Sequence, residues 1–295
     1  MTDLRGCIPI LCTPFHDDHS VDYDSLEREV DWVLAEGAAG VATLALASEG
    51  YKLNDIERVN VADVVINAVA GRVPVVVSAD GPGHAVALYR ARSAEASGAS
   101  ALMVLPPYFV TPDLQNLYDY YRQIGEAVSI PVMIQDAPQL TKVSMSPSLW
   151  AQLAADVPTI RYVKAEGTPG GPVITETRRL SEDRLQLFCG WGGLGAIDAF
   201  ERGAVGSMPA PNFTRLFADV QSLIDRGDTT AAEARFDSEL PFSLWAMQSI
   251  DFSVAAAKAE LHARGVIRST AMRQPATALD DISQRQLARW IARRF

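Results

Sequence analysis

Eight short apolar runs, each followed by a segment of helical length, constrain the fold of this 295-residue chain most strongly. Runs such as VPVVVS and ALMVLP are apolar at consecutive positions, which is typical of parallel strands buried on both faces. The runs are Ile8–Cys12, Val41–Leu46, Pro74–Ala79, Ala101–Pro106, Pro131–Asp136, Thr159–Ala165, Leu185–Gly190 and Ala204–Ala210. Their spacing of roughly 30 residues leaves room for one helix between consecutive strands.

The segments between the runs have helical patterns. The apolar residues of Leu26–Leu34 follow the 3.6-residue period, and Asp24 and Asn54 occupy positions typical of helix N-caps. Eight alternations of strand and helix predict the α/β class and, within it, a (β/α)₈ TIM barrel. A doubly wound open sheet is the alternative, and it usually has fewer strands.

The chain stays helical after the eighth unit. We therefore expect a barrel over residues 1–226 and a C-terminal helical extension over residues 227–295, packed on the barrel. The polar stretch Arg268–Leu279 has no strand pattern and is predicted to be a connector. Asp280–Phe295 is predicted to be a final amphipathic helix.

Composition and charge exclude several classes of partner. The formal net charge is −10, which argues against binding to a nucleic-acid backbone. No apolar run reaches the roughly 18 residues of a membrane span. The three cysteines, Cys7, Cys12 and Cys189, are odd in number and lack metal-ligand spacing, which predicts reduced thiols and a cytoplasmic location. Cys12 and Cys189 lie in apolar runs and are predicted to be buried packing residues.

Lysine is scarce, and one of the four lysines is placed where a barrel carries out chemistry. Active sites of such barrels lie at the C-terminal ends of the strands, and only Lys164 ends a predicted strand. Its apolar neighbours would partly desolvate the amine, which disfavours the ammonium form and leaves a nucleophile. The alternative is a structural lysine paired with Glu166 or Asp136.

The segment GWGGLG, from Gly190 to Gly195, is a G-x-G-x-x-G pattern between a predicted strand and a predicted helix. A dinucleotide site also needs an acidic residue roughly twenty positions further on, and residues 203–218 contain none. The glycines are better interpreted as making room near Lys164, and no cofactor is predicted. The four histidines have no partner at metal-ligand spacing, so no metal site is predicted.

The strand-end motifs resemble those of a known family over nearly the whole chain. They are the TPF of Thr13–Phe15, the S-E-x-x-x-L-x-x-x-E-R of Ser48–Arg58, the PPYF of Pro106–Phe109, and Lys164. This combination resembles the dihydrodipicolinate synthase/N-acetylneuraminate lyase superfamily of Schiff-base barrels. The resemblance implies that Lys164 forms an imine with a small 2-oxo acid and that the loop Leu46–Glu49 holds the substrate carboxylate. It also implies no cofactor and assembly as a homotetramer or a dimer.

The sequence departs from the family pattern at several of these positions. Leu46 and Ala47 replace a Thr-Thr pair, Phe109 replaces a second tyrosine, and Leu140 lies near the place of an expected arginine. Gln135 replaces the strand-five tyrosine that shuttles a proton during aldol cleavage. An amide does not titrate near neutral pH, so Gln135 can only orient a group or a water molecule.

The IQDAP motif around Gln135 and the K-x-E of Lys164–Glu166 are similar to the 2-keto-3-deoxy-L-arabonate dehydratase branch of the superfamily. We therefore expect a lyase that dehydrates a 2-keto-3-deoxy sugar acid through an imine and an enamine on Lys164. Gln135 would position the leaving hydroxyl, and Ser48 would bind the carboxylate or donate to the hydroxyl. Glu49 and Glu166 are candidates for proton transfer, with a structural ion pair as the alternative role of each.

A second group of residues is expected to form the substrate-binding wall. It comprises Leu46, Ala47, Tyr108, Gly190 and Met208. Tyr51 is a further wall candidate, whereas Trp191 is expected to serve mainly in packing. Two other functions stay open: a pyruvate-releasing aldolase or lyase of the same superfamily, and a non-catalytic binder or regulator that recognises a 2-oxo acid.

Overall fold

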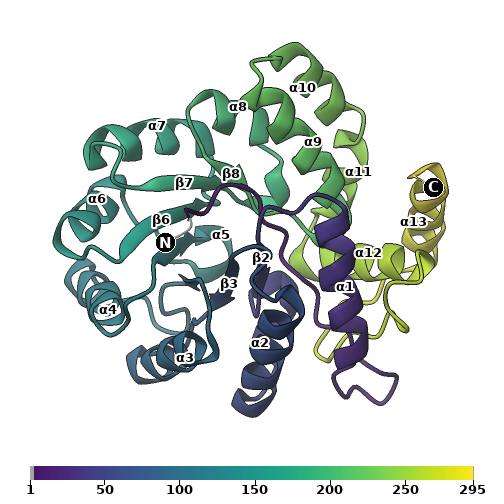
Figure 1. Cartoon of the computed structure of the whole chain (residues 1–295), viewed down its shortest axis with the longest axis horizontal. Coiled ribbons are helices and arrows are strands. Elements are labelled where there is room, and N and C mark those ends of the chain that lie inside the picture. The colour runs from purple at the N-terminus through teal and green to yellow at the C-terminus, as the bar shows by residue number, and fades with distance from the viewer. Residues whose placement is uncertain (1–2, 295) are drawn as a thin grey trace.

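Eight parallel strands surrounded by helices form the centre of the protein, whose computed structural model describes residues 3–294 (Figure 1). The strands are β1 (Gly6–Cys7), β2 (Val41–Thr43), β3 (Val75–Ser78), β4 (Ala101–Val104), β5 (Val132–Asp136), β6 (Ile160–Ala165), β7 (Gln186–Cys189) and β8 (Gly206–Ser207). Their order in the sheet is β1-β8-β7-β6-β5-β4-β3-β2. The predicted (β/α)₈ TIM barrel is confirmed.

The barrel closes where the first segment of the chain meets β2. Ile10 forms a parallel bridge with Ala42, and the Ala42 N–H donates to the carbonyl of Pro9 at 2.9 Å. The predicted bounds of the first strand, Ile8–Cys12, are wrong, since regular pairing covers only Gly6–Cys7. Pro9 has no N–H group, so it cannot continue a regular ladder of hydrogen bonds through this segment.

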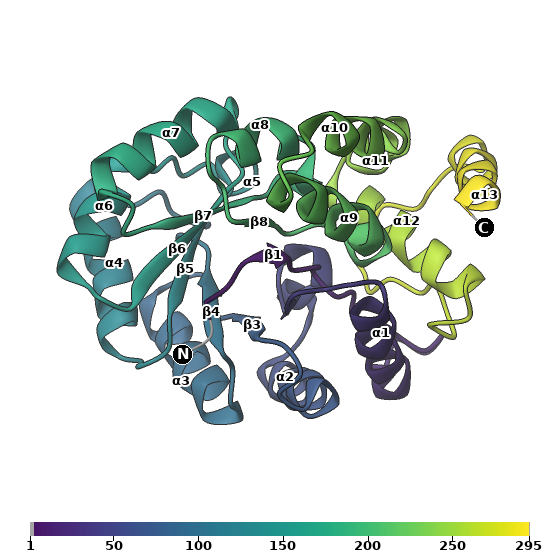
Figure 2. The ribbon, with the colours of Figure 1, turned by 45° about the horizontal axis from the view of Figure 1, so that its top comes forward.

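Helices cover the outside of the strands, as Figure 2 shows from a second direction. They are α1 (Tyr23–Ala35), α2 (Asp55–Val69), α3 (His84–Ser97), α4 (Leu114–Glu126), α5 (Pro138–Thr141), α6 (Pro147–Asp156), α7 (Gly170–Ser181), α8 (Ala196–Glu201) and α9 (Thr214–Asp225). Four short 3₁₀ turns lie between them: η1 (Leu46–Ser48), η2 (Gly50–Lys52), η3 (Trp191–Gly193) and η4 (Pro211–Phe213).

Of the two N-cap residues predicted from the sequence, one is correct and the other is wrong. Asn54 caps α2 in a capping box with Glu57, as expected from its position. The expected cap Asp24 lies instead inside the first turn of α1, and Asp22 is the cap, accepting from the Ser25 N–H at 3.0 Å. Asp22 is the better cap because its side chain is buried next to the free N–H groups of the first turn.

Two apolar layers hold the barrel together. The larger layer lies between the strands and the helices, and the smaller fills the inside of the barrel. The inner layer includes Met103, Met133, Tyr162 and Phe188, all fully buried. The Tyr162 hydroxyl accepts a hydrogen bond from the Leu4 N–H at 3.1 Å. These side chains fill the interior of the barrel. A ligand can therefore bind only at the mouth of the barrel, where the strands end.

Four helices follow the barrel: α10 (Thr229–Asp237), α11 (Leu240–Ala246), α12 (Ile250–Ala263) and α13 (Asp281–Arg294). No helix or strand occurs between α12 and α13, which confirms the predicted connector Arg268–Leu279. The final helix begins at Asp281, one residue later than expected, and Phe295, its predicted end, lies outside the described residues. In Figure 1, α13 lies at the edge of the molecule.

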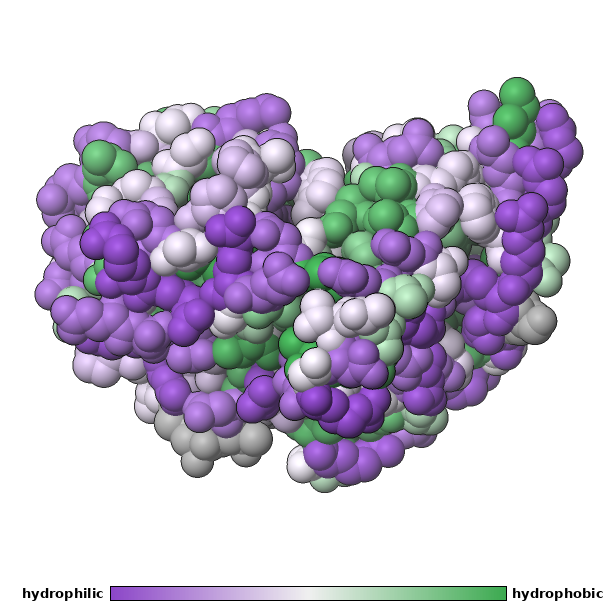
Figure 3. All heavy atoms as spheres, turned by 90° about the horizontal axis from the view of Figure 1, so that it is seen from above, coloured by the Kyte–Doolittle hydropathy of each residue, from purple (hydrophilic) through white to green (hydrophobic). Residues whose placement is uncertain are grey.

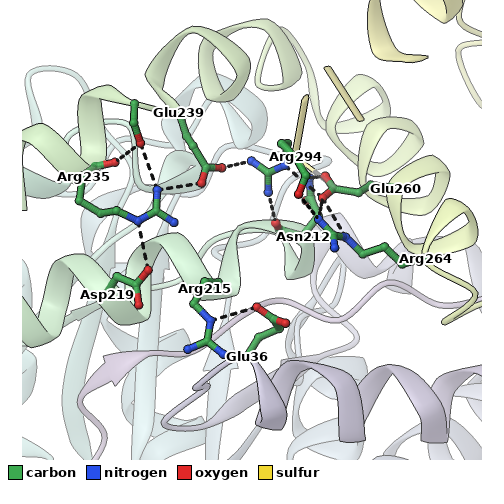
Figure 4. A network of polar contacts seen from close by, with 10 residues as sticks. Glu36, Asn212, Arg215, Asp219, Arg235, Glu239, Glu260, Arg264 and Arg294 are labelled. Atoms are coloured by element: carbon green, nitrogen blue, oxygen red, sulfur yellow. Dashed lines mark hydrogen bonds and ion pairs between the residues drawn. The ribbon is translucent and has the colours of Figure 1, made fainter. Parts of the chain in front are cut away.

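An arginine cluster ties α13 to the end of β8 (Figure 4). Arg294 donates to the Asn212 carbonyl at 2.6 Å and pairs with Glu239 and, at 3.1 Å, with Glu260. Arg264 also pairs with Glu260, at 2.9 Å. Desolvation of Arg294, followed by repulsion from Arg235, lowers its pKa to about 10. The cluster therefore connects α12, α13 and the N-cap of α11 to η4, which follows β8 after three intervening residues.

The surface seen from above is mostly hydrophilic, with hydrophobic residues gathered beside a hollow (Figure 3). Within residues 3–294, no helix is both long enough and apolar enough to span a lipid bilayer.

Candidate active site

Lys164 lies at the C-terminal end of β6 and points into the barrel. Alternate residues of a strand face the same side, and Tyr162, two positions earlier, belongs to the inner apolar layer. Lys164 is therefore seated above the filled interior, and only 6% of it is exposed. Its Nζ lies 2.6 Å from Oε1 of Glu166, so the ion pair that was one expectation for this lysine is present.

Gln135 and Glu166 complete a polar group around this amine. Gln135 pairs in register with Lys164 across β5 and β6, and its Nε2 donates to the same Glu166 oxygen at 3.0 Å. Gln139 on α5 donates to the Glu166 carbonyl, also at 3.0 Å. Within residues 3–294, the buried Gln135 Oε1 has no hydrogen-bond partner. It is thus an acceptor that a ligand hydroxyl or a water molecule can satisfy.

Gly190 provides the space that Glu166 occupies. A Cβ atom at Gly190 would lie 2.3 Å from the Glu166 Cγ and 3.1 Å from the Ala165 carbonyl oxygen. Real carbon atoms do not approach so closely, so a side chain here would displace Glu166. The glycine-rich segment therefore does make room near Lys164, and within it Gly192 adopts a φ of 64° in η3.

A small cavity, here called the inner cavity, opens over these residues. Lys164, Gln135, Glu166, Leu46, Ala47 and Met208 all line it, so six of the ten predicted site residues meet here. Trp191 lines it as well, although packing was the role expected for it. Gly190 does not line the inner cavity, but it lies against the side chain of Glu166, which does.

The turn η1 forms one side of the inner cavity. Its first hydrogen bond runs from the Ser48 N–H to the Ala45 carbonyl at 3.1 Å, so the N–H groups of Leu46 and Ala47 precede it. Thr13 supports the turn by donating to the Ser48 carbonyl at 2.6 Å. The Ser48 hydroxyl is fully buried, has no partner among residues 3–294, and does not line the inner cavity.

Glu49, the other candidate for proton transfer, lies outside the inner cavity. Its carboxylate pairs with Lys258 of α12 at 2.5 Å and with Lys52 at 2.9 Å, and it accepts the Arg273 N–H at 3.1 Å. Both partner ammonium groups and the carboxylate itself are almost fully buried. Of the two roles considered for Glu49, this geometry favours the structural one.

A second space, here called the outer cavity, adjoins the first. It is larger than the inner cavity, and Leu46 and Ile250 belong to the walls of both. Tyr108 and Tyr51, expected beside the substrate, line this outer cavity instead of the inner one. A ligand bound to Lys164 would thus reach the two tyrosines only through atoms several bonds away from its reacting carbon.

Burial also perturbs titratable groups near the site. Desolvation, followed by repulsion from Glu166, raises the pKa of Asp136 to about 7. Burial raises the pKa of Cys189 to about 12 and that of Cys12 well above its usual range, so neither is a thiolate at neutral pH. Both cysteines are buried and free, as predicted. No group of three potential metal ligands occurs in the part of the chain that the structure describes.

Among the wall residues of the inner cavity that were not predicted, three lie far from any strand in the sequence: Met247, Ile250 and Ser253. They lie at or after the end of α11 and on α12, in the C-terminal helices. No sequence motif identifies these residues, because none of them lies near the end of a predicted strand. Asp80, which follows β3 and lines the outer cavity, does have such a mark, since it lies just beyond a predicted strand.

The fold defines a (β/α)₈ barrel with a polar group at its mouth, and comparisons with known proteins identify its family. The model of the dihydrodipicolinate synthetase family matches residues 3–294. An L-2-keto-3-deoxyarabonate dehydratase from Azospirillum brasilense is 32% identical, over 99% of this chain and 94% of its own length. A 4-hydroxy-tetrahydrodipicolinate synthase from Bartonella quintana is 30% identical, over 81% of this chain and 82% of its own length.

Solved structures agree with the sequence matches. The crystal structure of a dihydrodipicolinate synthase from Rhodopseudomonas palustris superposes with a TM-score of 0.92 at 31% identity. The superposition covers 99% of this chain and 98% of the chain in that crystal structure. The chain belongs to the dihydrodipicolinate synthetase family.

Proposed function

We propose that this enzyme dehydrates a 2-keto-3-deoxy sugar acid, such as 2-keto-3-deoxy-L-arabonate, through a Schiff base on Lys164. The carrying observation is the buried group in which Glu166 Oε1 contacts both Lys164 Nζ, at 2.6 Å, and Gln135 Nε2, at 3.0 Å. An amine, a carboxylate and a neutral amide thus meet around one point, which supports Lys164 as the nucleophile. The match to a dehydratase over nearly the full chain supports the same choice.

The reaction begins when the Lys164 amine attacks the C2 ketone and the carbinolamine loses water to form an iminium. The positive iminium acidifies the C3–H bond. Glu166 lies next to the nitrogen and therefore next to C3, and its carboxylate removes the C3 proton to give the enamine. The enamine expels the C4 hydroxyl, which leaves as water with the proton that Glu166 has taken up. Tautomerisation and hydrolysis release the oxo acid and restore the amine, with a net loss of one water.

Gln135 and the turn η1 orient the substrate in this scheme. The unpaired Gln135 Oε1 accepts a hydrogen bond from the C4 hydroxyl or from a water molecule. The N–H groups of Leu46 and Ala47, with the Ser48 hydroxyl, bind the C1 carboxylate. Aldol cleavage, the second candidate, would need a proton acceptor for the C4 hydroxyl, and the neutral amide of Gln135 cannot be that acceptor.

The C-terminal helices belong to this site. We also propose the division into a barrel over residues 1–226 and an extension over 227–295, in which α12 supplies Ile250 and Ser253 to the wall of the inner cavity. Assembly as a homotetramer or a dimer forms part of the same proposal.

Borohydride trapping tests the proposal. Pyruvate and 2-keto-3-deoxy-L-arabonate are each incubated with enzyme and borohydride, and the intact mass is measured. A covalent adduct is expected in the wild type and in Lys142→Ala, whose lysine is exposed, and no adduct in Lys164→Ala. With the sugar acid, the adduct and the released product should have lost water and kept all carbons. Release of pyruvate would favour an aldolase, and absence of any adduct would favour a binder.

The variant Glu166→Gln tests the proposed role of Glu166 as the base without removing the nucleophile, Lys164. It should still form the adduct with pyruvate while turnover of the sugar acid falls by about 10² to 10⁴, the usual contribution of a general base. Unchanged turnover in Glu166→Gln would exclude Glu166 as the base.

A further inference from the structure

A buried carboxylate in the outer cavity takes no part in the mechanism above. Asp80 follows β3 and is only 4% exposed. Among residues 3–294 it is the one charged side chain in the wall of the outer cavity. The remaining polar groups of that wall are the hydroxyls of Tyr51, Tyr108 and Thr141, and the rest is apolar.

The hydrogen bonds around Asp80 leave most of its accepting capacity open. Its Oδ1 accepts from the Ser78 hydroxyl at 2.5 Å. The two nearest arginines are used elsewhere: Arg58 donates to the carbonyls of Gly50 and Ser78, both at 2.7 Å. Arg90 donates to the Asp80 carbonyl at 2.7 Å and pairs with Asp55 at 2.9 Å. In the described chain, no salt bridge joins the Asp80 carboxylate to a basic side chain, although its charge interacts with that of Arg58.

A buried carboxylate needs hydrogen-bond donors, because desolvation of an unpaired charge is costly. Tyr108 lies close to it: burial, followed by the negative charge of Asp80, raises the pKa of that phenol. Tyr108 therefore stays a neutral hydroxyl beside the carboxylate. The wall so formed accepts hydrogen bonds from a ligand and repels a ligand carboxylate.

The position of the outer cavity indicates which part of the substrate reaches it. With C1 at the turn η1 and C2 on Lys164, the tail of the substrate extends past Leu46, which lines both cavities. The tail of a 2-keto-3-deoxy sugar acid has hydroxyl groups, which are donors. The tail of a dicarboxylic oxo acid would bring a second negative charge next to Asp80.

We propose that Asp80 is a specificity-determining residue that accepts hydrogen bonds from the terminal hydroxyl groups of the substrate. The substrate class is then a 2-oxo acid with a hydroxylated tail, and 2-oxo dicarboxylates bind less tightly. This inference rests on the proposed Schiff-base function of Lys164.

The test compares three acids of five carbons in the borohydride assay: 2-keto-3-deoxy-L-arabonate, 2-oxopentanoate and 2-oxoglutarate. The concentration for half-maximal trapping should be lowest for the hydroxylated acid and highest for the dicarboxylate. Asp80→Asn should raise that concentration about 10- to 100-fold for the hydroxylated acid, as expected for the loss of a charged hydrogen bond. For 2-oxopentanoate, which has no donor in its tail, the change should be several-fold smaller. For 2-oxoglutarate the concentration should fall.

Asp237→Asn, which makes the same chemical change at an exposed position, is the matched control and should leave all three values unaltered. Equal effects of Asp80→Asn on all three acids would overturn the inference and leave the Schiff base intact. The wild-type ranking alone provides a test without any variant: equal trapping of the three acids also overturns the inference. Failure to trap any 2-oxo acid on Lys164 would overturn the proposed function and this inference together.

Discussion

Replacing Lys258 with methionine should destabilise the protein strongly, because it removes one partner of a buried ion pair. Lys258 is completely buried on α12, and its Nζ contacts Glu49 Oε1 at 2.5 Å and the Ala271 carbonyl at 2.8 Å. The ammonium also lies 4.4 Å from the ring centroid of Phe15. Methionine keeps most of the apolar volume of the lysine stem, so the main loss is electrostatic.

The expected cost follows from what remains around Glu49. Breaking a buried pair by removing one partner typically costs about 3 to 5 kcal/mol, since the other charge is left uncompensated. Here Glu49 keeps Lys52 at 2.9 Å and the Arg273 N–H at 3.1 Å. We therefore expect the lower end of that range, about 3 kcal/mol of unfolding free energy. Removing the charge of Glu49 as well, in the double variant with Glu49→Gln, should recover part of this loss.

Guanidinium denaturation followed by far-ultraviolet circular dichroism measures the free energy of unfolding. Lys142→Met is the matched control, because Lys142 is exposed, and it should cost less than about 0.5 kcal/mol. Two results would refute the reasoning: a loss below about 1 kcal/mol in Lys258→Met, or a double variant whose loss equals the sum of the single losses.

The same variant should weaken substrate binding. Glu49 directly follows the turn η1 and adopts a left-handed φ of 55°. Its ion pairs hold the end of this turn in place. Loosening it in Lys258→Met should raise the concentration of pyruvate needed for half-maximal trapping on Lys164, whereas Lys142→Met should not change it.

Two further perturbations test the packing and the charge around Lys164. Gly190→Ala places a Cβ at 2.3 Å from the Glu166 Cγ, so turnover should fall at least about 10-fold, while Gly195→Ala, whose Cβ meets no atom within 4 Å, should be neutral in the same activity assay. Full activity in Gly190→Ala would contradict the placement of Glu166. Asp136 has its pKa raised from 3.8 to about 7, so the folded state binds its proton more tightly, and the contribution of Asp136 to stability should decrease as pH rises from about 4 to about 7. Asp136→Asn should thus be more stable than the wild type at pH 8, by on the order of 2 to 4 kcal/mol, with the difference vanishing near pH 4 in denaturation curves. A difference independent of pH would refute the assignment.

The sequence by itself determined the barrel, because local patterns record which faces of each element are buried. Consecutive apolar positions marked the strands, and the 3.6-residue period marked the helices. Lys164 could be singled out since it ends a predicted strand, and the ends of all eight strands meet at one mouth. The same reasoning placed Gln135, Glu166 and Met208 among the predicted site residues, and all three line the inner cavity. The bounds of the first strand were predicted wrongly: Pro9 has no N–H to donate toward β2, although Ile8 and Ile10 on either side of it still donate to the carbonyls of Ser207 and Pro209.

The positions and partners of the charged residues were decided only by the tertiary structure. Glu49 and Glu166 were equivalent candidates in the sequence, yet Glu166 lies beside Lys164 and Glu49 pairs with Lys258, which is 209 positions away. Periodicity states that a side chain is buried, and it contains no information about which distant partner packs against it. For the same physical reason, the contribution of α12 to the cavity wall, through Ile250 and Ser253, became visible only once the chain was folded.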